Sequence, residues 1–221
     1  MPLGVVSAGV VRAGAAQGSV ADASSQRAGH ATTQPTALPL VGATAGDSLP
    51  PMKVRFTDDR GVDGFSWLVE EPMTRTSHAL AAEGRIWLVD PVDWDEAIGR
   101  ALALGAPAAV LQLLDRHHRD CAALAARLDV PHLVAPPLVA DAPFEVVTVR
   151  RSRRWQEVAL WWPQRDTLVV AEAVGTNPFF TAGHGPAGIH LLLRLRPPRA
   201  ALGRYAPRHL LVGHGHGLHG A

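Results

Sequence analysis

The chain has 221 residues, of which 47% are hydrophobic, and a formal net charge of +1 with histidine counted as neutral. This composition indicates one globular domain or two small ones, and the near-zero charge gives no electrostatic reason to expect nucleic acid or an anionic membrane as partner. The single cysteine, Cys121, excludes an intramolecular disulfide framework. No hydrophobic run reaches the roughly 18–20 residues that a membrane-spanning helix needs. We therefore expect a cytoplasmic protein without membrane or nucleic-acid partners.

The first 51 residues differ in composition from the rest of the chain. All twelve aromatic residues lie at or after Phe56, and residues 1–51 carry only four charged side chains. Such a segment has no large side chains to bury, so we expect a disordered extension. Met52 is a candidate start of the native protein, because the hydrophobic pattern of a globular domain begins directly after it. The predicted domain therefore spans residues 52–221.

Hydrophobic runs and helical patterns alternate through this domain. The spacing of hydrophobic residues predicts a helix over 94–104 with Asp93 as its N-cap, a second helix over 120–128, and a helical segment over 189–195. Strands are expected over 65–70, 85–90, 108–113, 131–134, 145–150, 157–162, 167–172 and 209–212. The first two of these strands are expected to be neighbours. The pattern indicates a mixed α/β fold with a substantial sheet.

Side chains with metal-binding chemistry follow the predicted strand at 108–113. Residues 115–121 read Asp-Arg-His-His-Arg-Asp-Cys and open the next helix. Loops at the carboxyl ends of strands are where α/β folds bind ligands, and a helix amino end should lower the pKa of the Cys121 thiol. Carboxylate, imidazole and thiolate are all zinc ligands. The alternative is that Asp120 is only a helix cap among solvated charges.

Two further polar groups follow predicted strands. His214 lies in a Gly-His-Gly-His-Gly run at 213–217, where glycine lets the backbone bring an imidazole close to a metal or a substrate. Glu172 ends the predicted strand at 167–172. The alternatives are a loose histidine-rich terminus and a salt-bridge carboxylate, respectively.

Taken in order, these motifs resemble the metallo-β-lactamase-fold superfamily. Residues 87–91 (Trp-Leu-Val-Asp-Pro) resemble an early strand and its aspartate turn, and residues 116–121 fall on the signature H-x-H-x-D-H. Residues 158–163, 168–173 and 211–215 resemble later strands of the family, the last with its final histidine. The resemblance covers about residues 62–221. It implies a four-layer αββα sandwich with the site at one edge of the sheets.

The resemblance also implies an altered metal site. The positions of the first metal in the family read Arg116, His118 and Arg153 here, and arginine has no lone pair to donate. The positions of the second metal in the family read Asp120, Cys121, Glu172 and His214 here. All four residue types can bind zinc. The expected cofactor is therefore one zinc ion. His118, no longer needed as a ligand, could act as general base.

Three functions are open at this point. The first is a mononuclear zinc hydrolase of a small-molecule ester, thioester, amide or phosphoester. The second is a catalytically silent member that serves as a binding or structural module, and the third is an iron-based redox site. Convergence of the predicted ligands without an arginine among them would favour zinc. An ion pair from Arg116 or Arg153 to Glu172 or Asp120 would favour the silent member.

Overall fold

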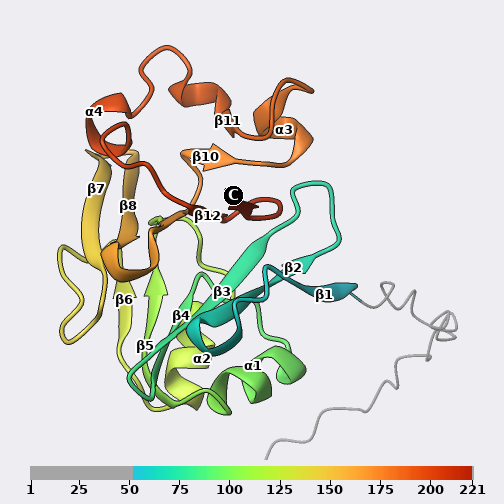
Figure 1. Cartoon of the computed structure of the whole chain (residues 1–221), viewed down its shortest axis with the longest axis vertical. Coiled ribbons are helices and arrows are strands. Elements are labelled where there is room, and N and C mark those ends of the chain that lie inside the picture. Colours follow the sequence, from blue (N-terminus) through green and yellow to red (C-terminus); the bar gives the residue numbers. More distant parts are fainter. Residues whose placement is uncertain (1–51, 221) are drawn as a thin grey trace, which may run out of the picture. The chain divides into compact units, whose positions relative to one another are not determined.

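A computed structural model describes residues 52–220, and the prediction of a disordered extension over 1–51 lies outside these residues. Two β-sheets pack face to face, and helices cover their outer faces (Figure 1). In the described part of the chain, no helix is long and apolar enough to cross a membrane.

The first sheet has six strands in the order β1-β2-β3-β4-β5-β6. The pairs β1–β2, β2–β3 and β3–β4 are antiparallel, whereas β4–β5 and β5–β6 are parallel. The strands are β1 (Val54–Thr57), β2 (Gly64–Val69), β3 (Thr76–Ala82), β4 (Arg85–Val89), β5 (Ala106–Gln112) and β6 (His132–Val134).

The predicted pairing of the strands at 65–70 and 85–90 is wrong, because β3 lies between β2 and β4 and pairs with both. Strand β3 was not predicted, since its residues are mostly small and lack the aromatic and β-branched enrichment typical of strands. Gly64 allows β2 to begin close to β3. A Cβ at Gly64 would lie 1.9 Å from the main-chain oxygen of Ala79, and its φ of +119° is a conformation that other residues rarely adopt.

The second sheet has five strands in the order β13-β12-β9-β8-β7, and β12 runs parallel to β9. Its strands are β7 (Glu145–Ser152), β8 (Trp155–Trp162), β9 (Thr167–Val170), β12 (His209–Val212) and β13 (Leu218–His219). Strand β13 was not predicted. It orders the histidine-rich end of the chain by pairing with β12. Strands β10 (Val174–Gly175) and β11 (Gly188–Ile189) form a separate hairpin-like pair.

The helices are shorter than predicted. Helices α1 (Asp95–Leu102) and α2 (Cys121–Arg127) pack on the outer face of the six-stranded sheet, where Ile98 and Leu124 join a buried cluster. The prediction that Asp93 caps α1 is wrong. The cap residue is Trp94, and both Asp93 oxygens bind the Arg127 guanidinium instead.

The second sheet carries a thinner outer layer. Helix α4 (Arg199–Leu202) lies against β7. Leu202 and Tyr205 pack against the buried cluster between the sheets, and the Tyr205 ring contacts Trp161. Helix α3 (Pro178–Thr181) precedes β11, and the helical segment expected at 189–195 is only the 3₁₀ turn η3 (Leu191–Leu193). The predicted αββα sandwich is thus confirmed.

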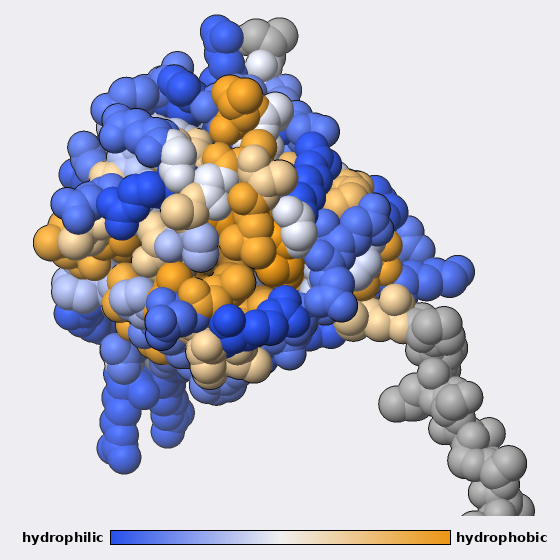
Figure 2. Space-filling model, turned by 90° about the horizontal axis from the view of Figure 1, so that it is seen from below, coloured by the Kyte–Doolittle hydropathy of each residue, from blue (hydrophilic) through white to orange (hydrophobic). Residues whose placement is uncertain are grey.

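The main core lies between the two sheets. Trp87 and Leu111 from one sheet meet Leu160, Val169 and other buried residues from the opposite sheet. Each such side chain contributes roughly 1.5–3 kcal/mol to folding by leaving water. Seen from the end where α1 and α2 lie, hydrophobic residues also run through the middle of the surface, with hydrophilic residues around them (Figure 2).

Candidate metal centre

Four strands end at the same edge of the sandwich and bring polar side chains together there. Asp90 directly follows β4, and His117 lies in the loop after β5, which runs parallel to β4. Glu172 and His214 each lie two residues beyond the parallel strands β9 and β12. Parallel strands end at the same edge, so the topology alone places these residues near one another.

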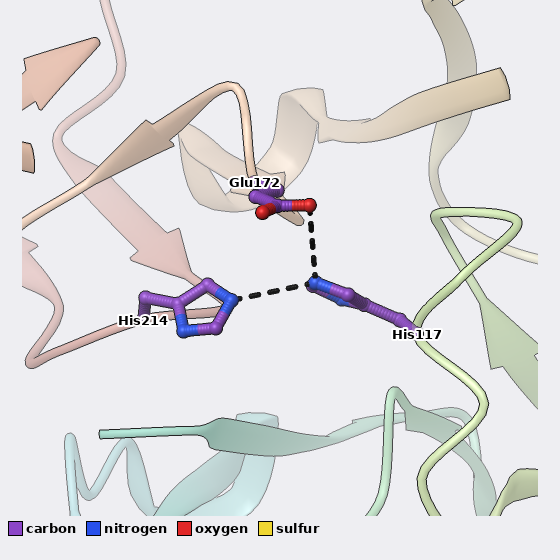
Figure 3. Close-up of side chains that lie close together, drawn as sticks. All are labelled: His117, Glu172 and His214. Carbon is purple, nitrogen blue, oxygen red and sulfur yellow. Dashed lines mark hydrogen bonds and ion pairs between the residues drawn. The ribbon is translucent and has the colours of Figure 1, made fainter. Parts of the chain in front are cut away.

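His117, Glu172 and His214 point toward one another at this edge (Figure 3). The Nε2 atoms of the two histidines are 3.4 Å apart, and His117 Nε2 is 3.7 Å from Glu172 Oε2. One ligand atom from each residue lies within 4.8 Å of the others. The side chains of His117 and Glu172 are only 8% and 13% exposed, so the cluster is largely shielded from water.

The outer nitrogens of the two histidines have fixed acceptors. His117 Nδ1 donates to Asp90 Oδ2 at 2.9 Å, and His214 Nδ1 donates to the main-chain oxygen of Met73 at 2.9 Å. Burial lowers the pKa of His214 to about 4, with further lowering by the charges of Arg119 and His117, so this ring is neutral at pH 7. In a neutral ring with hydrogen on Nδ1, Nε2 carries a lone pair. His214 Nε2 therefore presents a lone pair to His117 Nε2 at 3.4 Å, an arrangement that calls for a proton or a cation between the two nitrogens.

Asp90 is the residue that orients His117. Its side chain is almost fully buried, and its second oxygen accepts a hydrogen bond from the main-chain nitrogen of Leu113 at 2.9 Å. Burial alone would raise the pKa of the Asp90 carboxyl. The His117 ring, the Arg119 guanidinium and the Leu113 N–H together hold this pKa below its ordinary value. Asp90 is thus a carboxylate, the usual partner behind a metal-binding histidine.

Glu172 is held through both its backbone and its side chain. The main-chain nitrogens of Glu172 and Ala173 donate to one oxygen of buried Glu157, at 2.9 and 2.8 Å. His190 accepts a hydrogen bond at Nδ1, so its Nε2 carries hydrogen and faces Glu172 Oε1 at 3.3 Å. Arg116 Nε lies 3.2 Å from Glu172 Oε2.

A partly buried arginine joins the strand ends. The Arg119 guanidinium donates to the main-chain oxygens of Thr76, Asp90 and Gly213. It thereby connects β3 with the residues that follow β4 and β12. Arg119 itself adopts a φ of +41°, which turns the chain sharply between His117 and α2. The sequence pattern assigned no function to this arginine.

The structure brings only part of the predicted ligand set together. Glu172 and His214 lie in the cluster, whereas Asp120 and Cys121 lie outside it. The Asp120 carboxylate accepts a hydrogen bond from the Asp93 main-chain nitrogen at 2.8 Å. Cys121 is fully buried in the packing of α2, and its thiol contacts the His117 main-chain oxygen. Burial raises the pKa of this thiol, so the predicted lowering by the helix amino end is wrong.

His117 is the residue that the sequence pattern missed. The predicted general base, His118, is exposed and lies outside the cluster, while its neighbour His117 points into it. The role predicted within this motif was therefore given to the histidine next to the one that lies in the cluster. The resemblance of residues 87–91 to the family's aspartate turn could have pointed to the site, because Asp90 at that turn accepts a hydrogen bond from His117.

The two arginines at expected metal positions differ in location. Arg116 lies over the Trp155 ring, 4.0 Å from its centroid, and pairs with Glu172. Arg153 is exposed in the turn between β7 and β8. The ion pair that would favour a silent protein is thus present, but it borders a ligand set different from the predicted one.

The cluster residues fit a zinc ion. Two imidazole nitrogens and one carboxylate are a donor set that catalytic zinc uses, with a fourth position left open. Two nitrogens bound to one tetrahedral zinc at 2.0–2.1 Å are about 3.3–3.4 Å apart. The 3.4 Å between the Nε2 atoms of His117 and His214 matches that separation.

Comparison with known proteins agrees with the architecture. No family model and no curated protein sequence matches the chain. Among solved structures, DIM-1 metallo-β-lactamase exposed to ceftazidime aligns with a TM-score of 0.52 and 14% identity, over 77% of this chain and 92% of that one. The metallo-β-lactamase FIM-1 from Pseudomonas aeruginosa, in a mono-zinc form, aligns with a TM-score of 0.50 and 10% identity, over 75% and 89% of the two chains. The expected resemblance is confirmed at the level of architecture: the chain has the metallo-β-lactamase fold.

Proposed function

We propose that the chain binds one zinc ion between His117, Glu172 and His214 and is a metal-dependent hydrolase of a small-molecule ester, thioester, amide or phosphoester. One observation carries this proposal. The Nε2 atoms of His117 and His214 face each other at 3.4 Å, because both Nδ1 atoms donate to fixed acceptors.

When bound, zinc would supply a Lewis acid and lower the pKa of a coordinated water toward about 7. The residues of the chain orient the site for that chemistry. Asp90 holds the tautomer of His117, and His190 holds the Glu172 oxygen that does not face His117. Arg116 has a side chain 40% exposed beside Glu172, so it can reach both the site and solvent. Its guanidinium is placed to bind an anionic group of a substrate or the charge that develops on an oxygen.

Metal content tests the ligand set. The untagged chain, stripped with a chelator and dialysed against zinc, should retain one equivalent. His117→Ala should bind zinc at least tenfold more weakly, whereas His118→Ala, which removes the same side chain one residue away, should bind like the parent. Equal zinc retention in both variants would overturn the proposal.

The histidines near the chain end need their own control. Strand β13 pairs with β12, so deletion of the end would disturb the sheet. The point variant His216→Ala is preferable, because it removes an exposed imidazole and keeps the strand. Zinc that disappears with His216→Ala and persists in His117→Ala would place the metal on the chain end.

Hydrolysis is tested separately with chromogenic ester, thioester, anilide and phosphoester substrates. We expect turnover of at least one class that stops on chelation, returns with zinc and is absent in His117→Ala. Turnover that is equal in His117→Ala and His118→Ala would contradict a reaction at this site.

A second candidate, a catalytically silent binding module, is favoured by the ion pair of Arg116 with Glu172. In that case the arginine supplies the positive charge, and the two histidines share a proton. Arg116→Gln distinguishes the two functions. A silent module should gain zinc affinity when this competitor is removed, whereas a hydrolase should keep its zinc and lose turnover.

A further inference from the structure

A second group of charged and imidazole side chains lies at the opposite end of β12. His209 is the first residue of β12, and His214 lies beyond its last residue, so at about 3.3 Å per residue the two are roughly 16 Å apart. A cavity of about 280 Å³ lies beside His209. It is lined by Asp59, Arg60, Asp63, Arg165, His209 and His219.

The acidic residues of this cavity already have partners. Asp59 pairs with Arg100 at 2.7 Å, and Asp63 pairs with Arg165 at 2.7 Å. Arg60 has no ion pair among the described residues, and its Nη1 is buried without a hydrogen-bond partner. Arg60 is therefore a lining guanidinium without an ion-pair partner, on which the Asp63 and Asp58 carboxylates act only from a distance, and it stays protonated at neutral pH.

The surroundings of Arg60 make this charge costly. Its guanidinium carbon lies 5.6 Å from the centre of the Trp162 ring, which covers one side of the group. Burial lowers the pKa of Arg60, the Asp63 and Asp58 carboxylates partly offset this, and the charge of Arg165 lowers the pKa further. A cation that is partly removed from water without a partner lowers stability, so a bound counter-charge would be favourable.

The two histidines are held in position beside Arg60. His219 Nε2 faces the Asp58 carboxylate at 3.1 Å, so it donates there and its Nδ1 is an acceptor. His209 Nδ1, 2.9 Å from His219 Nδ1, is then the donor to it. The pair is thus ordered through Asp58 and lines the cavity with a fixed orientation.

We propose that this cavity binds a phosphate-type oxyanion, free or as the end group of a larger molecule, with Arg60 as its principal anchor. A guanidinium presents two parallel N–H donors that match an oxyanion better than any other side chain. The site is separate from the candidate metal centre and does not depend on the proposed function.

The test uses the full chain, with inorganic phosphate and phenyl phosphate as probes and sodium chloride to hold ionic strength constant. Calorimetric titration should show saturable binding of one equivalent. Arg60→Gln should weaken this binding at least tenfold. Arg208→Gln, which removes the same charge from a nearby exposed position outside the cavity, should change it less than twofold.

Two further measurements make the outcome decisive. Circular dichroism of Arg60→Gln should match the parent, and His117→Ala should bind phosphate like the parent. Tighter binding of phenyl phosphate than of phosphate would identify a phosphomonoester as the ligand class, and equal binding would identify the free anion. Equal binding by Arg60→Gln and the parent, equal losses in both arginine variants, loss in His117→Ala, or no saturable binding would overturn the proposal.

Discussion

Replacing Asp90 by asparagine tests how His117 is kept ready to bind a metal. In the native protein Asp90 Oδ2 accepts hydrogen from His117 Nδ1, and Asp90 Oδ1 accepts hydrogen from the Leu113 main-chain nitrogen. An asparagine can keep the Leu113 bond only if its amide nitrogen faces His117. That nitrogen donates, so His117 Nδ1 must accept, and the ring hydrogen moves to Nε2. It then lies between His117 and His214, where the metal would bind.

The size of the effect follows from this change of tautomer. Loss of the partner behind a metal-binding histidine typically costs 10–100-fold in metal affinity. At about 1.4 kcal/mol for each factor of ten, this corresponds to roughly 1.4–2.8 kcal/mol. The hydrogen bond from His117 to the Asp90 carboxylate is buried and involves a charged group. We therefore expect Asp90→Asn to lower the free energy of unfolding of the metal-free protein by about 1.5–3 kcal/mol.

Zinc competition titration against a chromophoric chelator measures the affinity, and urea unfolding measures the stability. Asp93→Asn is the matched control, because it neutralises a carboxylate that pairs with Arg127 outside the cluster. We expect its zinc affinity to equal that of the parent. Unchanged zinc affinity in Asp90→Asn, with folding intact, would refute the tautomer argument.

Three further predictions follow from buried groups. The Cys121 thiol should resist thiol reagents in the native protein, and Cys121→Ala should keep its full zinc content; zinc loss in this variant would assign the thiol to the metal. Arg119→Gln should lower the free energy of unfolding in urea by at least about 3 kcal/mol, because it removes bonds to three main-chain oxygens, and a loss below 1 kcal/mol would contradict its role in joining the strand ends. Burial lowers the pKa of His78 from 6.5 to about 4, so the unfolded chain binds more protons than the native one between these pH values. The His78 contribution should therefore lower the free energy of unfolding by roughly 3 kcal/mol as the pH drops across this range, in addition to that of His214. His78→Asn should remove this part of the slope, and an undiminished slope in that variant would exclude His78 as a source.

The strands that position the site could be predicted from the sequence because they are buried on both faces. Strands β4, β5, β9 and β12 are continuous hydrophobic runs, and their ends are marked by polar or glycine residues. Glu172 and His214 were found for the same reason, since each follows such a run by two residues. Strand β3, which lies between β2 and β4, was missed because its residues are mostly small and carry no hydrophobic signature of their own.

The exact histidine could not be predicted, because it lies in a loop. In a strand or a helix the period of side chains decides which residues share a face, but residues 113–120 follow neither period. The left-handed backbone at Arg119 and the hydrogen bond from Asp90 orient His117 inward and leave His118 exposed. Both depend on contacts with residues distant in sequence.

Misassigned roles had the same origin in long-range contacts. Asp93 has the residue type of a helix cap, yet its carboxylate binds Arg127, 34 residues away. Cys121 stands at a helix amino end, which should favour a thiolate, yet burial in the packing of α2 dominates and raises its pKa. Local rules predict a residue's possible roles, and the tertiary environment decides among them.

The central claim is that one zinc ion lies between His117, Glu172 and His214. A crystal structure of the zinc-loaded chain, with anomalous data collected on both sides of the zinc absorption edge, tests it most directly. We expect one strong peak about 2.0–2.1 Å from both Nε2 atoms and about 2.0–2.2 Å from a Glu172 oxygen. A peak only at His209, His216 or His219, or no peak in a fully loaded crystal, would contradict the account.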